Sequence, residues 1–285
     1  MSISEPASGH TLAIAGVGLL GGSIAAAAKQ RGLARRVIGI GRNPKHLQAA
    51  VDAGLIDSFV TDPADCDAEW NFAIVATPVH RIADEVHRIA AASRRGTLIT
   101  DVGSVKADVC RAAAQGLPDG IHFVGSHPLA GSEKNGCEFS DARLFEGRVT
   151  IVTPLDSSQD EAADSVTEFW TALGSIVHRL DVVTHDRVLA MTSHLPHIAA
   201  AALASILTAE LRPFAATGFG DTTRIAAGNP DLWVSILLSN ADAVVGSLDG
   251  FSQQFEQFRE AVRNRDGERL KTLLQLAKTA RDTLD

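Results

Sequence analysis

A glycine-rich turn near the N-terminus constrains the fold of this chain more than any other feature. The run Gly16-Val17-Gly18-Leu19-Leu20-Gly21 follows an apolar segment at 11–15 and precedes an alanine-rich segment at 23–32. This spacing is typical of a dinucleotide-binding strand–turn–helix unit, in which Gly16 permits the tight turn, Gly18 lets the backbone approach a pyrophosphate, and Gly21 allows close helix–strand packing. The helix N-terminus favours phosphate through its free N–H groups and dipole. We therefore predict that all six residues bind a dinucleotide.

The first 180 residues alternate short β-rich runs with helical stretches. Such alternation predicts a mostly parallel sheet covered by helices, an α/β fold of the Rossmann type. After Leu180 no strand pattern returns, and we predict an all-helical domain. The expected domains are therefore 1–180 and 181–285. Strands are expected at 11–15, 36–40, 72–76, 97–101, 122–125, 149–152 and 176–179, and the later helices at 184–211, 231–248, 250–264 and 269–284.

The segment 198–207 is apolar on every side and carries no charge. A helix that is apolar all round must be buried. In a small helical domain, the surface that buries it is expected to belong to a second copy of the chain, because most soluble oligomers are symmetric homo-oligomers. A central helix of a monomer would show the same pattern. We predict a homodimer held together by the helical domain.

Composition and charge exclude several classes of protein. The net charge of −8 argues against nucleic-acid binding, which needs a basic surface. The three cysteines, Cys66, Cys110 and Cys137, form no CxxC pair and indicate a reducing compartment without a disulfide or zinc framework. The polar residues 1–10 do not resemble a signal peptide, and we predict a cytoplasmic protein that does not enter a membrane. The chain has no tyrosine, so the Tyr-x-x-x-Lys pair of short-chain dehydrogenases is absent.

Three turns follow predicted strands and are expected to border the cofactor. Ligands of such sheets bind outside the carboxyl ends of the strands, which are followed here by Arg42, by Thr77-Pro78 and by Gly103. At the end of the second strand, Gly41-Arg42 stands where a carboxylate usually binds the ribose 2′-hydroxyl of NAD. The missing acid beside an arginine slightly favours NADP over NAD. Arg42 is almost as compatible with a solvated loop position.

Three further segments carry side chains suited to chemistry. They are 125–133, which contains His127 and Glu133, 193–197, which contains His194 and His197, and 221–224, which ends at Arg224. Histidine exchanges protons near neutral pH, and arginine binds carboxylates through a planar fork. Each of these residues, taken alone, is more simply interpreted as a packed histidine or a surface charge.

Together the motifs resemble the prephenate/arogenate dehydrogenase family of tyrosine biosynthesis. The matching segments are 16–23, 101–106, 125–133, 193–197 and 223–226, in the order of the family, and they run from about Leu12 to the last helices. The resemblance implies a Rossmann domain followed by a helical dimerisation domain. It also implies oxidative decarboxylation of prephenate to 4-hydroxyphenylpyruvate, or of arogenate directly to tyrosine, with hydride transfer to NAD(P)+.

The resemblance also implies roles for individual residues. His127 would accept the proton of the substrate hydroxyl, with Ser104 hydrogen-bonding near it, and a neutral imidazole suits this role. Substrate binding is implied for His197, Arg224, His194 and Glu133. Of these four residues, Arg224 offers a bidentate fork for a carboxylate. No metal is expected, because hydride transfer to a nicotinamide needs none.

Two other functions fit parts of the sequence. Hydroxyacid and 6-phosphogluconate-type dehydrogenases use a lysine of the helical domain, but residues 181–270 contain no lysine. A catalytically inactive NAD(P)-sensing protein would bind the cofactor without turnover, and the presence of His127, His197 and Arg224 argues against it. Because the chain ends soon after the last expected helix, we expect no regulatory domain, and any tyrosine feedback is expected at the active site.

Overall fold

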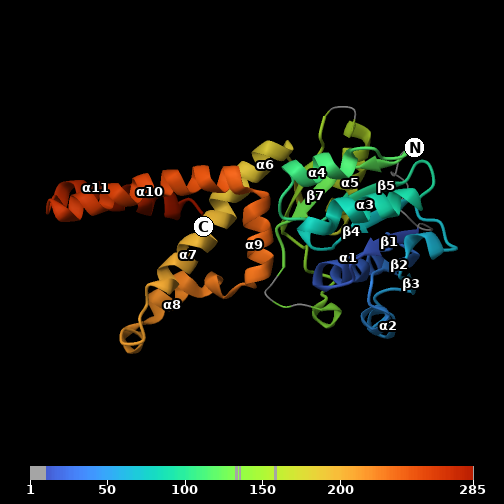
Figure 1. Ribbon diagram of the computed structural model, residues 1–285, viewed down its shortest axis with the longest axis horizontal. Coiled ribbons are helices and arrows are strands. Elements are labelled where there is room, and N and C mark those ends of the chain that lie inside the picture. Colours follow the sequence, from blue (N-terminus) through green and yellow to red (C-terminus); the bar gives the residue numbers. More distant parts are fainter. Residues whose placement is uncertain (1–10, 132–133, 135, 157–158, 285) are drawn as a thin grey trace.

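The computed structural model describes residues 11–131, 134, 136–156 and 159–284 and divides into a sheet-containing part and a helical part (Figure 1). A six-stranded parallel sheet in the order β3-β2-β1-β4-β5-β6 confirms the predicted Rossmann-type fold. Its strands and helices are β1 (Thr11–Ala15), α1 (Leu19–Gln30), β2 (Arg36–Ile40), α2 (Pro44–Asp52), β3 (Ser58–Val60), β4 (Phe72–Val75), α3 (Ile82–Ala91), β5 (Leu98–Asp101), α4 (Ala107–Ala114) and β6 (His122–Phe123). The short edge strand β3 was not expected from the sequence.

Strands β1 and β4 are almost entirely apolar because both faces of the sheet are covered. In β1, Leu12 and Ile14 pack into the core cluster that contains side chains of α1, whereas Ala13 and Ala15 pack into the cluster of α3 and α4. This alternation follows from the opposite directions of successive side chains in a strand. The glycine turn therefore lies at the carboxyl edge of a strand that is buried along most of its length.

A second, three-stranded sheet was missed by the sequence analysis. It consists of β7 (Gly125–Pro128), β8 (Val149–Thr153) and β9 (Ile176–Arg179), with β7 antiparallel to β8 and β8 parallel to β9. The single strand expected at 122–125 is in fact two strands, β6 and β7, that belong to different sheets. The backbone N–H of Ser126 donates to Oδ1 of Asp101 at 3.1 Å, which holds β7 across the end of β5. This contact brings His127 to the carboxyl edge of the main sheet.

The helical part begins immediately after β9. One continuous stretch contains α6 (Val182–Leu189), the π-helical turn η5 (Ala190–His194) and α7 (Leu195–Ser205). The expected single helix at 184–211 is thus interrupted, and Pro196 supplies the reason: proline has no N–H to donate, and its ring crowds the carbonyl four residues earlier. The division at residue 180 into domains 1–180 and 181–285 stays a prediction.

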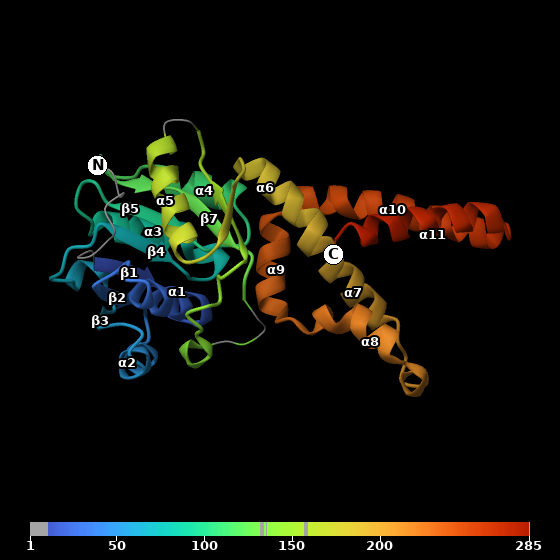
Figure 2. The ribbon, with the colours of Figure 1, turned by 180° about the vertical axis from the view of Figure 1, so that it is seen from behind.

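The remaining helices form an open arrangement beside the sheet (Figure 2). The expected break at residue 249 is wrong: α10 continues through it, and the chain bends by 94° at Asn240 instead, between α9 and α10. The elements are α8 (Thr217–Thr223), the short 3-10 helix η7 (Arg224–Ala227), α9 (Pro230–Ser239), α10 (Ala241–Arg263) and α11 (Gly267–Asp282). In both views α10 and α11 lie side by side and project away from the sheet.

Large apolar side chains of the helical part are exposed. Leu238, Phe255 and Leu276 are 72%, 64% and 65% exposed. By length and composition, one helical stretch in the described part of the chain, Val182–Ser205, is also long and apolar enough to cross a membrane. That stretch carries the ionisable side chains of His185 and Asp186, which are buried against the sheet-containing part, and charged groups are costly in a bilayer.

Candidate active site

A cleft of about 840 Å³ opens at the carboxyl ends of β1, β2 and β4. Its lining includes six of the residues predicted to bind the cofactor: Gly16, Val17, Gly18, Arg42, Thr77 and Pro78. Leu19, Leu20, Gly21 and Gly103 do not line it. Leu20 packs on the hydrophobic core. A Cβ on Gly21 or on Gly103 would lie too close to neighbouring atoms, so packing within the protein explains both glycines. The cleft therefore matches the glycine turn and the ends of the next strands.

The glycines of the turn act in two different ways. Gly16 has φ +89°, and a Cβ there would lie 2.5 Å from the carbonyl oxygen of Ala76. A Cβ on Gly21 would collide with the carbonyl oxygen of Gly16, whereas a Cβ on Gly18 would meet nothing within 4 Å. Gly16 and Gly21 are thus required by the protein's own packing, and Gly18 keeps the space in front of the helix clear.

The residues of the cleft fit a bound dinucleotide. Gly18 is the N-cap of α1 and provides no side-chain cap, so the first N–H groups of the helix remain available for a pyrophosphate. The Oγ1 atom of Thr77 is buried and has no hydrogen-bond partner among the described residues. Buried hydroxyls are normally paired, and a polar ligand in the cleft would satisfy this one.

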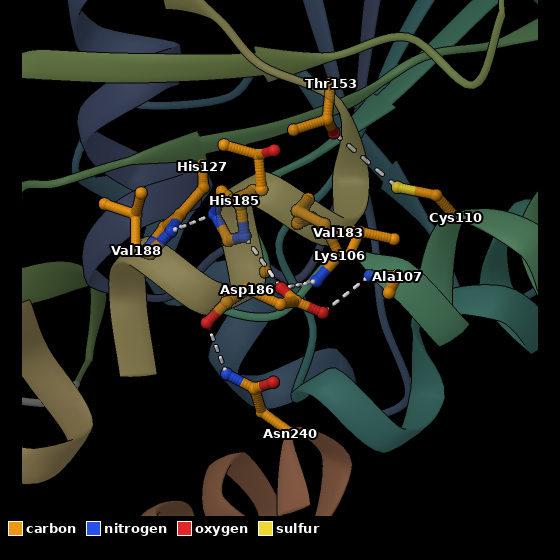
Figure 3. Close-up of polar contacts among 12 residues, drawn as sticks. Lys106, Ala107, Cys110, His127, Thr153, Val183, His185, Asp186, Val188 and Asn240 are labelled. Carbon is orange, nitrogen blue, oxygen red and sulfur yellow. Dashed lines mark hydrogen bonds and ion pairs between the residues drawn. The ribbon is translucent and has the colours of Figure 1, made fainter. Parts of the chain in front are cut away.

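His127 lies in β7 and is only 9% exposed. Its Nδ1 atom is 3.0 Å from Nε2 of His185, and Nδ1 of His185 is 2.8 Å from Oδ1 of Asp186 (Figure 3). Both partners belong to α6. Sequence analysis missed His185 and Asp186, because nothing in their local sequence shows that α6 folds back against β7. Their adjacency to each other was the only available signal.

A buried ion pair supports the turn after β5. Lys106 and Asp101 pair through Nζ and Oδ2, and both side chains are fully buried. Oδ2 of Asp101 also accepts the backbone N–H of Gly103 at 2.8 Å. A Cβ on Gly103 would come within 2.8 Å of the same oxygen, which explains the glycine. The ion pair therefore holds the backbone of the turn that contains Ser104.

Serine is a favoured N-cap residue, and the sequence predicts that Ser104 caps a helix at 104–115; this prediction is wrong. The helix begins at Ala107, and its first N–H groups are capped from another part of the chain. Oδ1 of Asp186 accepts the N–H of Lys106 and Oδ2 accepts that of Ala107, both at 2.8 Å. The half-buried hydroxyl of Ser104 is therefore not used as a helix cap.

His194 belongs to a buried polar network. Nδ2 of Asn240 donates to Nδ1 of His194 at 3.2 Å and to the backbone carbonyl of Asp186 at 2.8 Å. His194 is only 1% exposed. The network joins α6, the π-helical turn and the start of α10. Packing in this network accounts for the burial of His194. A role of His194 in substrate binding stays a prediction.

His197 and Arg224 lie on neighbouring elements. The imidazole of His197 stacks on the indole of Trp233, with ring centroids 3.6 Å apart and an interplanar angle of 10°. Nδ1 of His197 is buried without a hydrogen-bond partner in the part of the chain that the structure describes. Arg224 is exposed on η7, which packs against α7, and within the described ranges it forms no ion pair. Trp233 was not predicted, and Glu133 lies outside the described residues.

The histidines of the site are neutral at pH 7. Burial, together with the neighbouring His185 and Lys106, holds the pKa of His127 well below its usual value. Burial also lowers the pKa of His194 to about 4 and lowers the pKa of His197. Neutral His127 is therefore able to accept a proton.

Two family descriptions match consecutive parts of this chain. "Prephenate dehydrogenase, nucleotide-binding domain" matches residues 24–179, and "Prephenate dehydrogenase, dimerization domain" matches residues 181–276. The chain belongs to the prephenate dehydrogenase family. Members of this family are enzymes of tyrosine biosynthesis, and the resemblance inferred from the motifs is confirmed.

Relatives within the prephenate dehydrogenase family match nearly the whole chain. The prephenate dehydrogenase of Bacillus subtilis is 35% identical over 281 residues, covering 96% of this chain and 76% of that protein. The cyclohexadienyl dehydrogenase of Zymomonas mobilis is 32% identical, covering 91% and 90%. The crystal structure of prephenate dehydrogenase from A. aeolicus in complex with hydroxyphenyl propionate and NAD+ has a TM-score of 0.90 and 31% identity, covering 97% and 98%. The arogenate dehydrogenase of Synechocystis has a TM-score of 0.85 and 27% identity, covering 96% and 100%.

Proposed function

We propose that this protein catalyses the oxidative decarboxylation of prephenate to 4-hydroxyphenylpyruvate. The observation that carries the proposal is His127, a buried neutral histidine held at the same carboxyl edge of the sheet as the dinucleotide cleft. Membership of the prephenate dehydrogenase family supports the same reaction. A neutral histidine beside a nicotinamide site suits the oxidation of a secondary alcohol, which requires removal of a proton and a hydride.

The reaction assigns distinct tasks to the residues of the site. A nicotinamide dinucleotide held in the cleft by the glycine turn would supply the acceptor for the hydride of the carbinol carbon. His127 accepts the proton of the ring hydroxyl as the hydride leaves, and Ser104 provides a hydroxyl on the adjacent turn. The bond to the ring carboxylate breaks, its electron pair enters the ring, and CO2 departs. His127 then returns the proton to the ring oxygen of the aromatic product, so that protons balance.

Substrate binding falls to the helical part in this proposal. Arg224 would bind one substrate carboxylate through two parallel hydrogen bonds. His197 would donate or accept a hydrogen bond through the buried Nδ1 atom, which lacks a partner among the described residues. Its ring orientation is fixed by the stack on Trp233. His194 would support this face from the buried network behind it.

The cofactor is a nicotinamide dinucleotide, and we propose that the site takes NAD+ and also admits NADP+. The A. aeolicus relative is described with NAD+. In this chain the cleft residues after β2 are Gly41, Arg42, Asn43 and His46, none of which is a carboxylate that would repel a 2′-phosphate. The exposed Arg42 would bind that phosphate. The slight preference for NADP+ expected from Arg42 has no support from the relatives.

We further propose that the enzyme is a homodimer formed through residues 181–285. The family description that matches residues 181–276 names them a dimerization domain. The exposed apolar side chains of α9, α10 and α11 supply the surface, because apolar areas of this kind mark protein–protein interfaces. A soluble biosynthetic enzyme of this kind is expected in the cytoplasm.

A steady-state assay of prephenate and arogenate, each with NAD+ and NADP+, tests the proposal. We expect reduction of NAD+ with prephenate, measured by absorbance of the reduced nicotinamide. Arogenate as the better substrate would make the enzyme an arogenate dehydrogenase. Cofactor binding without turnover in all four pairs would favour an NAD(P)-sensing protein. The Arg42→Ala variant sharpens the cofactor assignment: its KM for NADP+ should rise about tenfold, with little change for NAD+.

A further inference from the structure

The proton positions along three residues of the site follow from simple valence. A carboxylate oxygen only accepts hydrogen bonds, so Nδ1 of His185 carries the hydrogen that is donated to Oδ1 of Asp186 at 2.8 Å. The neutral ring of His185 then has its lone pair on Nε2. That lone pair faces Nδ1 of His127 at 3.0 Å, so Nδ1 of His127 must be the donor. The remaining nitrogen of His127, Nε2, is left with a free lone pair.

Asp186 is held as a carboxylate by its other contacts. Its two oxygens cap α4 by accepting the N–H groups of Lys106 and Ala107, both at 2.8 Å. Burial raises its pKa, but the hydrogen bonds from His185, Ala107 and Lys106 outweigh burial and lower the pKa overall. Figure 3 shows these bonds converging on one carboxylate at the junction of α6 and α4. An ionised and immobile Asp186 leaves His185 one orientation.

We propose that His185, anchored by Asp186, is a positioning residue that fixes His127 in the Nδ1–H tautomer and so presents Nε2 as the proton acceptor. The source of the proton in this inference rests on the proposed function. The tautomer of His127 does not, because hydrogen bonds within the protein set it. Free histidine in water favours the Nε2–H tautomer, which has no lone pair at the reacting position. The network therefore selects the productive form before substrate binds.

Burial is the main reason that both histidines are neutral before the reaction: it lowers the pKa of His127 and of His185, Lys106 lowers both further, and Asp186 and Asp101 raise the pKa of His185. Besides His185 and Asp186, the groups that act on the pair are Lys106 and Asp101 from the β5–α4 turn and His194 from the π-helical turn. When His127 accepts a proton, its new charge is stabilised through the Nδ1–H bond to His185 and the carboxylate behind it. No second proton transfer is required. His185 contributes by accepting a hydrogen bond that grows stronger as His127 becomes charged.

Nitrogen-15 NMR of the histidine side chains tests the tautomer without any substrate. Long-range proton–nitrogen correlations distinguish a protonated ring nitrogen from one with a lone pair, and the His127→Gln spectrum assigns the His127 signals. In the wild-type enzyme we expect a protonated Nδ1 and an unprotonated Nε2 for His127. An unprotonated Nδ1 would overturn the proposal. Because this measurement needs no turnover, its result is independent of whether prephenate is the substrate.

Two substitutions of His185 separate positioning from packing. Phenylalanine keeps the ring shape but accepts no hydrogen bond, so His185→Phe should shift His127 toward the Nε2–H tautomer. Glutamine places an amide oxygen near the position of Nε2, so His185→Gln should retain the Nδ1–H tautomer even if His185→Phe fails to fold. The exposed His178 on β9 offers a control, and His178→Phe should change neither tautomer nor turnover.

Kinetics provide the second measurement. In His185→Phe we expect kcat to fall about tenfold or more at unchanged KM, and the acid limb of the kcat/KM profile to move to lower pH, because protonated His127 loses its acceptor. His185→Gln should lie between this variant and the wild type. A loss of activity with an unmoved acid limb and an unchanged tautomer would mean that His185 only packs the site. An inactive wild-type enzyme would refute the proposed function and leave the NMR result standing.

Discussion

The sheet-containing part and the helical part of this molecule differ in how they bury their apolar side chains. In the first part, both faces of the sheet are covered by helices of the same chain, and β1 and β4 are buried along most of their length. In the second part, α10 and α11 leave large apolar side chains exposed. A layered sheet completes its core locally, whereas the helical part has too few neighbours to do so. We therefore propose that the first part provides the chemistry and the second provides binding surfaces for substrate and partner.

The largest expected effect is on turnover, and it tests the assignment of chemistry to the sheet-containing part. The His127→Asn variant should lower kcat by about 10²-fold or more, because proton transfer by a positioned base contributes on that scale. The asparagine amide retains a donor near the position of Nδ1, so the bond to His185 and the packing are preserved. Steady-state kinetics with prephenate measure the effect. Near-normal kcat in His127→Asn would move the base to another residue.

Dimer formation tests the helical part. In Leu238→Asp, an unpaired charge would enter an apolar interface, and the dimer dissociation constant should rise about a hundredfold. Sedimentation velocity over a dilution series measures this change. Thr171→Asp on the exposed side of α5 (Asp160–Ala172) is the matched control and should leave assembly unaltered. Equal behaviour of the two variants would remove α9 from the interface.

The KM for prephenate tests whether the helical part binds the substrate. The Arg224→Ala variant should raise the KM for prephenate about tenfold or more with a smaller change in kcat, because a charged hydrogen-bonded pair is lost while the base remains. Comparison with His127→Asn then shows whether binding and chemistry are divided between the two parts. An unchanged KM in Arg224→Ala would exclude this residue as the carboxylate anchor.

The smallest expected effect is on the pH dependence of stability. The unfolded chain binds a proton at His194 below its usual pKa of 6.5, whereas the folded protein keeps this residue neutral down to about 4. The stabilisation is therefore complete above pH 6.5 and is lost as the pH falls toward 4. Within that interval, each such histidine should reduce the free energy of unfolding by about 1.4 kcal/mol per pH unit.

Urea unfolding of the wild type and of His194→Gln at several pH values measures this slope. The slope should decrease in His194→Gln, and His178→Gln should leave it unaltered because His178 is exposed. Buried His127 and His185 also have lowered pKa values and contribute to the remaining slope. Identical slopes in all three proteins would show that His194 is accessible to protons in the folded state.

Sequence alone determined the nucleotide-binding half of the fold and the family. The glycine turn, the apolar strands and the change of pattern near Leu180 are local signals, because strand and helix periodicity and glycine conformations depend on neighbouring residues. His127, His197 and Arg224 were found through motifs, but their neighbours were not. The break at Asn240 was also missed, because it depends on side-chain contacts with Asp186 and His194.

Only the tertiary structure joined His127 to His185 and Asp186, residues nearly sixty positions apart. It moved β7 into a second sheet through Ser126, and it replaced the expected cap of α4 at Ser104 by the carboxylate of Asp186. These outcomes depend on contacts between elements distant in sequence, and no local propensity encodes them. The glycine turn thus determined where a dinucleotide fits, while long-range hydrogen bonds determined which nitrogen of His127 is free to react.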